Sequence, residues 1–89
     1  MSTQAEWEEQ LRAEGFKDVY IAEDGPNVFY PVHVHGEKTA HVILEGEMTL
    51  VVGETSRLLR AGDRCDVPGD EPHSAKMGTS GCMYLVGEK

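Results

Sequence analysis

The chain has 89 residues and a net charge of −8 at pH 7, with 39% apolar and 27% charged residues. This length allows one small domain, and the composition is ordinary for a globular protein. The acidic balance argues against nucleic acid as a partner, because phosphate backbones attract Lys and Arg. No apolar run approaches the length of a membrane span and no signal peptide opens the chain, so we expect no membrane association and a cytoplasmic location.

Residues 3–14 are predicted to form a helix. Thr3 and Glu6 fit the S/T-x-x-E capping box, in which the two residues satisfy each other's free backbone N–H groups. Trp7 and Leu11 are four positions apart and therefore share one face of that helix. We expect this face to pack on the body of the protein.

From Phe16 onward the sequence consists of short runs of strand-forming residues. Clusters of Gly, Pro, Asn and Asp separate these runs every eight to twelve residues or so, which is typical of a sandwich or barrel. Gly53-Glu54 is expected to turn a hairpin, and Glu45-Gly46 and residues 78–81 are expected to end strands. The predicted strands cover residues 19–21, 28–30, 40–44, 48–52, 55–59, 65–67, 73–77 and 82–86.

The two cysteines, Cys65 and Cys82, form neither a C-x-x-C motif nor a disulfide framework. In a reducing compartment they are most simply free thiols that are at least partly buried.

All four histidines fall in two short stretches. His33-Val34-His35 is followed by His41, and His73 comes 38 residues after His35. An H-x-H pair on a strand places both imidazoles on one face, because side chains alternate with period two. Imidazole nitrogens suit iron, nickel, copper and zinc. His73 can complete a metal site only if the chain folds back on itself, which points to a small closed barrel.

These stretches resemble the two sequence motifs of the cupins, which are small double-stranded β-helix (jelly-roll) barrels. The first motif is matched by His33-Val34-His35 and Leu44-Glu45-Gly46, and the second by Gly62-Asp63, Pro68-Gly69 and Pro72-His73-Ser74. The resemblance covers roughly residues 16–87. It implies an all-β cupin barrel over residues 16–89, with a short N-terminal α-helix over residues 1–15 packed on it.

The resemblance also implies that His33, His35 and His73 lie inside the barrel and converge on one divalent metal ion. Iron, nickel, manganese and zinc all remain open as its identity. The family's fourth ligand is a glutamate, and counting back from Gly46 its position is held here by Thr39. A hydroxyl is a poorer metal ligand than a carboxylate, so this departure weakens the predicted site.

Three other positions depart from the family pattern. Asn27 holds the place of the glycine that opens the first motif. In the second motif Gly69 comes one position early, and Met77 stands where the family has asparagine.

Several groups are candidates to replace the missing carboxylate. His41 lies two residues after Thr39 and therefore faces the same side of its strand, so a four-histidine site is one possibility. A three-histidine site with Thr39 or water beside it is another. Glu37 lies two residues before Thr39, so it would face the same side. Its expected position in a turn argues against a side chain that points into the barrel, and it is therefore a weaker candidate.

Two kinds of function follow from the resemblance. A metal ion with an open coordination position supports dioxygenase-like, isomerase-like or lyase-like chemistry on a small molecule. The alternative is a non-catalytic module that binds or senses a small molecule, with a weakened or empty metal site. A barrel retained only as a scaffold is a third reading, against which the clustering of all four histidines argues. Small cupins commonly pair through strand edges, and an open edge needs covering, so a homodimer is expected.

Overall fold

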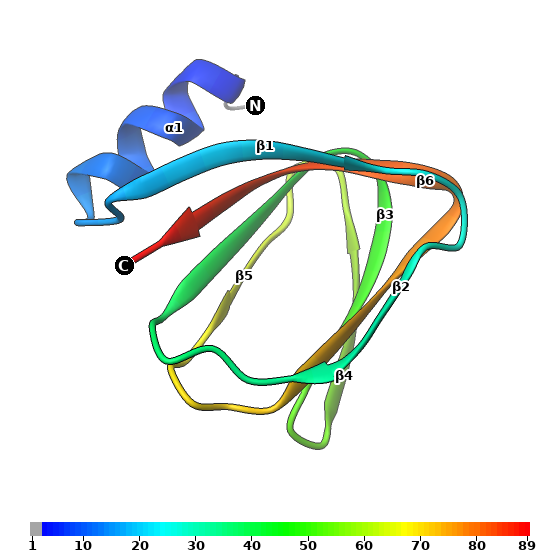
Figure 1. Ribbon diagram of the computed structural model, residues 1–89. Helices are drawn as coiled ribbons and strands as arrows, with labels where there is room; N and C mark the ends of the chain where they lie inside the picture. The colour runs from blue at the N-terminus through cyan, green and yellow to red at the C-terminus, as the bar shows by residue number, and fades with distance from the viewer. Residues whose placement is uncertain (1–2) are drawn as a thin grey trace.

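Two long strands, β3 (Thr39–Val52) and β6 (His73–Glu88), pair antiparallel with each other along most of their length and form the frame of the fold (Figure 1). The computed structural model describes residues 3–89. Both strands bend, so that residues 39–46 of β3 lie opposite residues 82–88 of β6, while residues 48–52 lie opposite residues 73–77. Each long strand therefore contributes to two walls of the barrel.

Four shorter strands complete these walls. On one side of the bend, β1 (Asp18–Asp24) pairs with β6 and β5 (Arg64–Val67) pairs with β3. On the other side, β2 (Phe29–His33) pairs with β6 and β4 (Thr55–Arg60) pairs with β3. The predicted all-β barrel with a short N-terminal helix is confirmed. The hairpin at Gly53-Glu54 is also observed, because it joins β3 to β4.

The prediction that Glu45-Gly46 and residues 78–81 end strands is wrong. Both stretches are bends inside a continuous strand, with shifts of register around residues 43–48 of β3. Gly46 and Gly81 have φ angles of 81° and 79°, which favour glycine, and a Cβ on Gly46 would collide with the carbonyl oxygen of Gly81. A bulge turns a strand without ending its ladder. The four runs predicted at residues 40–44, 48–52, 73–77 and 82–86 are therefore only two strands.

Helix α1 (Gln4–Ala13) begins with the predicted capping box. The Thr3 N–H donates to the Glu6 carboxylate at 3.1 Å, and the Glu6 N–H donates to the Thr3 hydroxyl at 3.2 Å. Leu11 is fully buried and Trp7 is partly buried beside it, as the shared face predicts. Met1 and Ser2, which belong to the predicted segment 1–15, lie outside the described residues.

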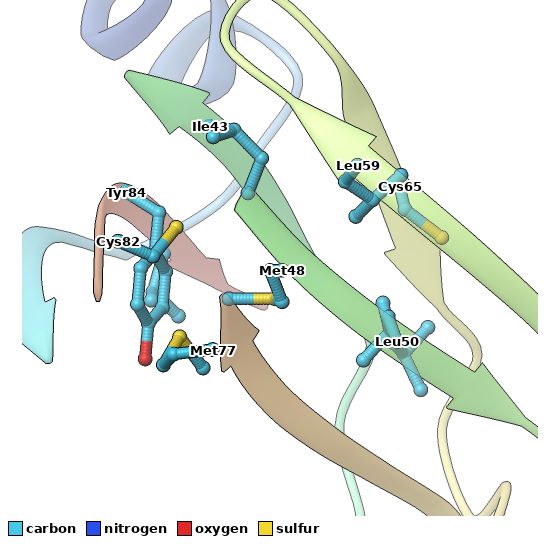
Figure 2. Packing of buried hydrophobic residues seen from close by; sticks show 10 residues of the cluster. Ile43, Met48, Leu50, Leu59, Cys65, Met77, Cys82 and Tyr84 are labelled. Atoms are coloured by element: carbon cyan, nitrogen blue, oxygen red, sulfur yellow. The ribbon is translucent and has the colours of Figure 1, made fainter. Parts of the chain in front are cut away.

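The helix closes one of two apolar clusters. Its Leu11 packs on the outer face of the barrel among Phe16, Ala40, Val42 and Leu85. The second cluster fills the interior near the bend (Figure 2), and its labelled members are Ile43, Met48, Leu50, Leu59, Cys65, Met77, Cys82 and Tyr84. Both cysteines are free and buried, as expected. Within residues 3–89, no helix has the length and apolar character needed to cross a membrane.

Candidate metal centre

Three imidazoles meet where β2 ends and β6 begins. His33 and His73 are cross-strand partners, and their ring centroids lie 4.2 Å apart. The ring of His35 lies 4.7 Å from that of His33 and 5.0 Å from that of His73. One possible ligand atom from each residue falls within 4.8 Å of the other two. The structure thus brings together the three histidines on which the predicted metal site depends.

Backbone carbonyls fix the orientation of two of these rings. His33 Nδ1 lies 2.7 Å from the carbonyl oxygen of Pro31, and His73 Nδ1 lies 2.9 Å from that of Glu71. A carbonyl oxygen only accepts, so Nδ1 carries the proton in both rings and donates it. Nε2 then keeps its lone pair free for a cation. A ring nitrogen held by a backbone carbonyl is the usual support of a metal-bound histidine, so this donor set fits a divalent metal.

The surroundings of His73 favour its neutral form. Burial lowers the pKa of His73, and the neighbouring His33 and His35 lower it further. Neutral imidazole is the form that binds metal. His73 is buried, His33 is partly buried and His35 is exposed, so the cluster opens to solvent on the side of His35. No carboxylate among residues 3–89 belongs to the group.

A cavity of about 570 Å³ extends from the three histidines into the barrel. Its wall is largely apolar, with Met48, Leu50 and Val86 among the side chains that line it. The volume lies in the range of sites that enclose small molecules. A cation held by the cluster would face this cavity.

His41 and Thr39 both line this cavity, as their shared parity on β3 predicts. His41 does not belong to the group of three, so its assignment as a further metal ligand stays a prediction. Burial lowers the pKa of His41 to about 4, which keeps its ring neutral at neutral pH. Glu37, the other candidate, is exposed and outside both the group and the cavity wall.

Sequence reasoning missed two tyrosines of the cavity wall. Tyr84 donates its hydroxyl to Asp24 at 2.6 Å, and Tyr20 donates to Glu88 at 2.9 Å. Burial, reinforced by the Glu88 bond, raises the pKa of Tyr20 to about 12. The only sequence signal was the alternation along β1 and β6, and the bend at residues 78–81 interrupts that count.

The arrangement suits a cation with open coordination positions. Three imidazoles leave part of the coordination sphere of a divalent ion free, as in catalytic zinc sites with three protein ligands. A small molecule in the cavity can then contact both the ion and the apolar wall.

The sequence pattern of one protein family matches most of the chain. This family is described as the AraC-like ligand binding domain, and the match covers residues 16–86. No curated protein sequence matches the chain.

Solved structures with the same architecture include a lyase, a cupin and a protein of unstated activity. The DMSP lyase DddQ from Ruegeria pomeroyi is 28% identical, with a TM-score of 0.74 over 80% of this chain and 36% of the lyase. The TT1209 protein from Thermus thermophilus is 31% identical, with a TM-score of 0.67 over 80% of this chain and 69% of that protein. An RmlC-like cupin from Shewanella frigidimarina is 24% identical, with a TM-score of 0.70 over 79% of this chain and 63% of the cupin. The chain thus spans about a third of the lyase and under two thirds of the Shewanella cupin.

Proposed function

The chain belongs to the family of AraC-like ligand binding domains, within the cupins, and we propose that it binds a small molecule at a metal centre. The metal is one divalent ion, held by His33, His35 and His73. When bound, such an ion supplies a Lewis-acidic position at the end of the cavity. The side chains of the barrel wall enclose the molecule and keep bulk water away from it.

The observation that carries this proposal is the fixed orientation of two rings. The carbonyls of Pro31 and Glu71 hold the Nδ1 protons of His33 and His73, which frees Nε2 of both rings. A histidine packed only for stability has no need of a free ring nitrogen beside two other imidazoles. The identity of the ion stays open among iron, nickel, manganese and zinc, because imidazole suits all four.

Turnover of the bound molecule is the second candidate function. The 28% identity to a DMSP lyase supports lyase-like chemistry over the dioxygenase-like and isomerase-like alternatives. Against turnover stands the state of the two carboxylates beside the cavity tyrosines: Asp24 and Glu88 both accept hydrogen bonds from them. We therefore place binding or sensing first.

Metal content tests the first proposal. Protein made without a histidine tag should retain close to one equivalent of a divalent metal by elemental analysis, and His73→Ala should lose it. His41→Phe is the matched control, since it removes a cavity imidazole outside the group of three. A wild-type protein that stays empty after incubation with each of the four metals would contradict the metal centre.

Mass spectrometry of the native protein separates binding from turnover. A small molecule that co-purifies with the metal-loaded protein and stays unchanged on prolonged incubation with air supports a binding module. Conversion of that molecule by the wild type, but not by His73→Ala, would replace binding by catalysis as the function.

We also propose a homodimer that forms through β2. This strand pairs only with β6, so its other edge has no strand partner among the described residues. Val32 is 70% exposed, Val34 is 54% exposed and Phe29 is 60% exposed along this edge. Light scattering during gel filtration should give twice the chain mass, and Val32→Lys should give a monomer. Leu58→Lys, on an exposed position of β4, should leave the dimer intact.

The free thiols support a reducing compartment, and we place the protein in the cytoplasm on that ground. Cys65 and Cys82 are buried and unpaired with each other. Disulfides persist mainly in oxidising compartments.

A further inference from the structure

Two buried polar atoms on neighbouring inward positions of β3 have no hydrogen-bond partner. They are Thr39 Oγ1 and His41 Nδ1, and no other buried side-chain nitrogen or oxygen of residues 3–89 shares this state. Thr39 is only 3% exposed. An unpartnered buried polar atom costs roughly 1–3 kcal/mol, and buried polar groups are otherwise almost always bonded. Two such atoms on alternate residues of one strand indicate a partner that comes from outside the chain.

Both residues line the cavity that begins at the three histidines. They are alternate residues of one strand and therefore face the same side. The wall around them is mainly apolar, with Met48, Leu50 and Val86 among its members. A molecule in the cavity thus meets polar groups in two places, at the metal centre and at the pair of Thr39 and His41.

The two places differ in charge. Three neutral imidazoles leave both positive charges of a divalent ion uncompensated, because no carboxylate belongs to the group. The carboxylate of Glu88 lines the cavity but already accepts the hydroxyl of Tyr20 at 2.9 Å. An uncompensated divalent charge attracts anions, so the metal end of the cavity favours an anionic oxygen.

The pair of Thr39 and His41 is uncharged. A threonine hydroxyl donates one hydrogen bond and accepts others, and a neutral imidazole nitrogen either donates or accepts. A carboxylate can only accept, so it pairs with both groups only when both of them donate. An alcohol both donates and accepts, so it can pair with one group that donates and one that accepts.

We propose that Thr39 and His41 form a subsite for a hydroxyl group, and that the ligand is a small hydroxycarboxylate whose carboxylate meets the metal ion. This inference rests on the proposed metal centre and names its ligand class. It gives His41 a role in ligand recognition in place of metal ligation.

Matched pairs of simple carboxylates test the subsite. Propionate, butyrate and valerate are titrated calorimetrically into the zinc-loaded protein, and so are 3-hydroxypropionate, 4-hydroxybutyrate and 5-hydroxyvalerate. Hydroxyls next to the carboxylate are avoided because they chelate metal directly. At one chain length the hydroxy acid should bind at least about tenfold more tightly than its partner, because a buried polar site rejects an analogue that leaves it unpaired.

Variants assign that preference to the pair. Thr39→Val keeps the shape of the side chain without its hydroxyl, and it should reduce the preference to less than about twofold. His41→Phe should do the same, and both variants should keep one equivalent of zinc. Thr39→Ser restores a hydroxyl and should restore the preference. Thr49→Val makes the same chemical change on β3 outside the cavity wall, and it should leave the preference unchanged.

Stability gives a readout that needs neither metal nor ligand. The Thr39 hydroxyl has no partner in the protein. Thr39→Val should therefore leave the melting temperature of the metal-free protein unchanged or raise it by about 4 °C. A fall of more than about 5 °C would mean that the hydroxyl has a protein partner, and it would overturn the subsite.

The outcomes separate the two proposals. Zinc uptake with equal affinities for both acids of every pair overturns the subsite and leaves the metal centre standing; the pair then holds water only. Loss of zinc in His41→Phe also overturns the subsite, because His41 is then a metal ligand. Failure of the wild type to take up zinc overturns the metal centre and the ligand class with it.

Discussion

The two faces of β3 carry different kinds of side chain over the same four residues. Ala40 and Val42 are fully buried on the outer face, in an apolar cluster with Leu11 of the helix. Thr39 and His41 face the cavity and keep polar atoms without a partner. Alternation along one strand thus separates a face that stabilises the fold from a face that lines the cavity.

We therefore expect stability and the proposed ligand binding to respond to different substitutions in this chain. Apolar burial on the outer face stabilises the protein and makes no contact with the cavity. Unpartnered polar atoms on the inner face lower stability, as is common at sites adapted to a ligand. Substitutions on each face should therefore affect different measurements.

The largest effect is expected at Leu11. Leu11→Ala removes a fully buried side chain from the outer cluster and leaves a cavity, so the free energy of unfolding should fall by about 3 kcal/mol. Urea unfolding measures this loss. The metal content per folded molecule should stay at the wild-type level, because Leu11 lies outside the cavity wall.

Leu58→Ala is the matched control, since Leu58 is 50% exposed on β4. Its unfolding free energy should change by less than about 0.5 kcal/mol. If Leu11→Ala lost metal in its folded fraction, the two faces of β3 would not be independent.

The next effect concerns pH in the metal-free protein. The pKa of His41 is lowered from 6.5 to about 4 by burial, with His73 and His35 lowering it further and with the backbone of Cys65 and the charge of Asp66 acting in the opposite direction. The unfolded chain therefore binds a proton before the folded protein does as the pH falls. The contribution of His41 to stability should therefore fall by about 3 kcal/mol between about pH 6.5 and pH 4 and change little below that range.

His41→Phe tests this origin. The variant has no proton to bind at that position, so its unfolding free energy should decline much less over the same pH range. Urea unfolding at a series of pH values gives both curves. Parallel curves for the wild type and the variant would assign the acid sensitivity to other groups, of which His73 is the first candidate because burial lowers its pKa too.

Local signals predicted much of this structure. The capping box of Thr3 and Glu6 fixed the start of the helix, and the spacing of Trp7 and Leu11 identified its buried face. The H-x-H pair and His73 were identified as a cluster because the motif spacing of a known fold brings them together.

The bends could not be predicted, because a bulge reverses the count of inward and outward residues. Along β3 the cavity is lined by Thr39 and His41 before the bend and by Met48 and Leu50 after it, so odd positions give way to even ones. Period-two counting from one end of a strand therefore fails at the other end. Tyr84 was missed for this reason: it lies beyond the bend of β6, with parity opposite to that of His73.

The smallest effect on stability is expected at the ion pair between Glu14, at the C-terminal end of the helix, and Arg64 of the barrel. Arg64 on β5 donates to both carboxylate oxygens of Glu14, at 2.7 and 2.8 Å, and also to Asp66 at 2.8 Å. The bonds from Arg64, together with one from the Gln10 amide, lower the pKa of Glu14 from 4.5 to about 2. The side chain of Glu14 is 37% exposed, so solvent screens much of the attraction. A negative charge at a helix C-terminus also opposes the helix dipole.

Glu14→Gln should therefore lower the unfolding free energy at pH 7 by only about 0.5 kcal/mol, far less than Leu11→Ala. The contribution of a lowered carboxyl pKa is present above pH 4.5 and is lost as the pH falls toward 2, below the range in which His41 acts. Urea unfolding at low ionic strength and in about 1 M salt checks the origin of the effect, since high salt should erase the difference between variant and wild type. A loss as large as that of Leu11→Ala would mean that the ion pair, rather than apolar burial, holds the helix to the outer face of the barrel.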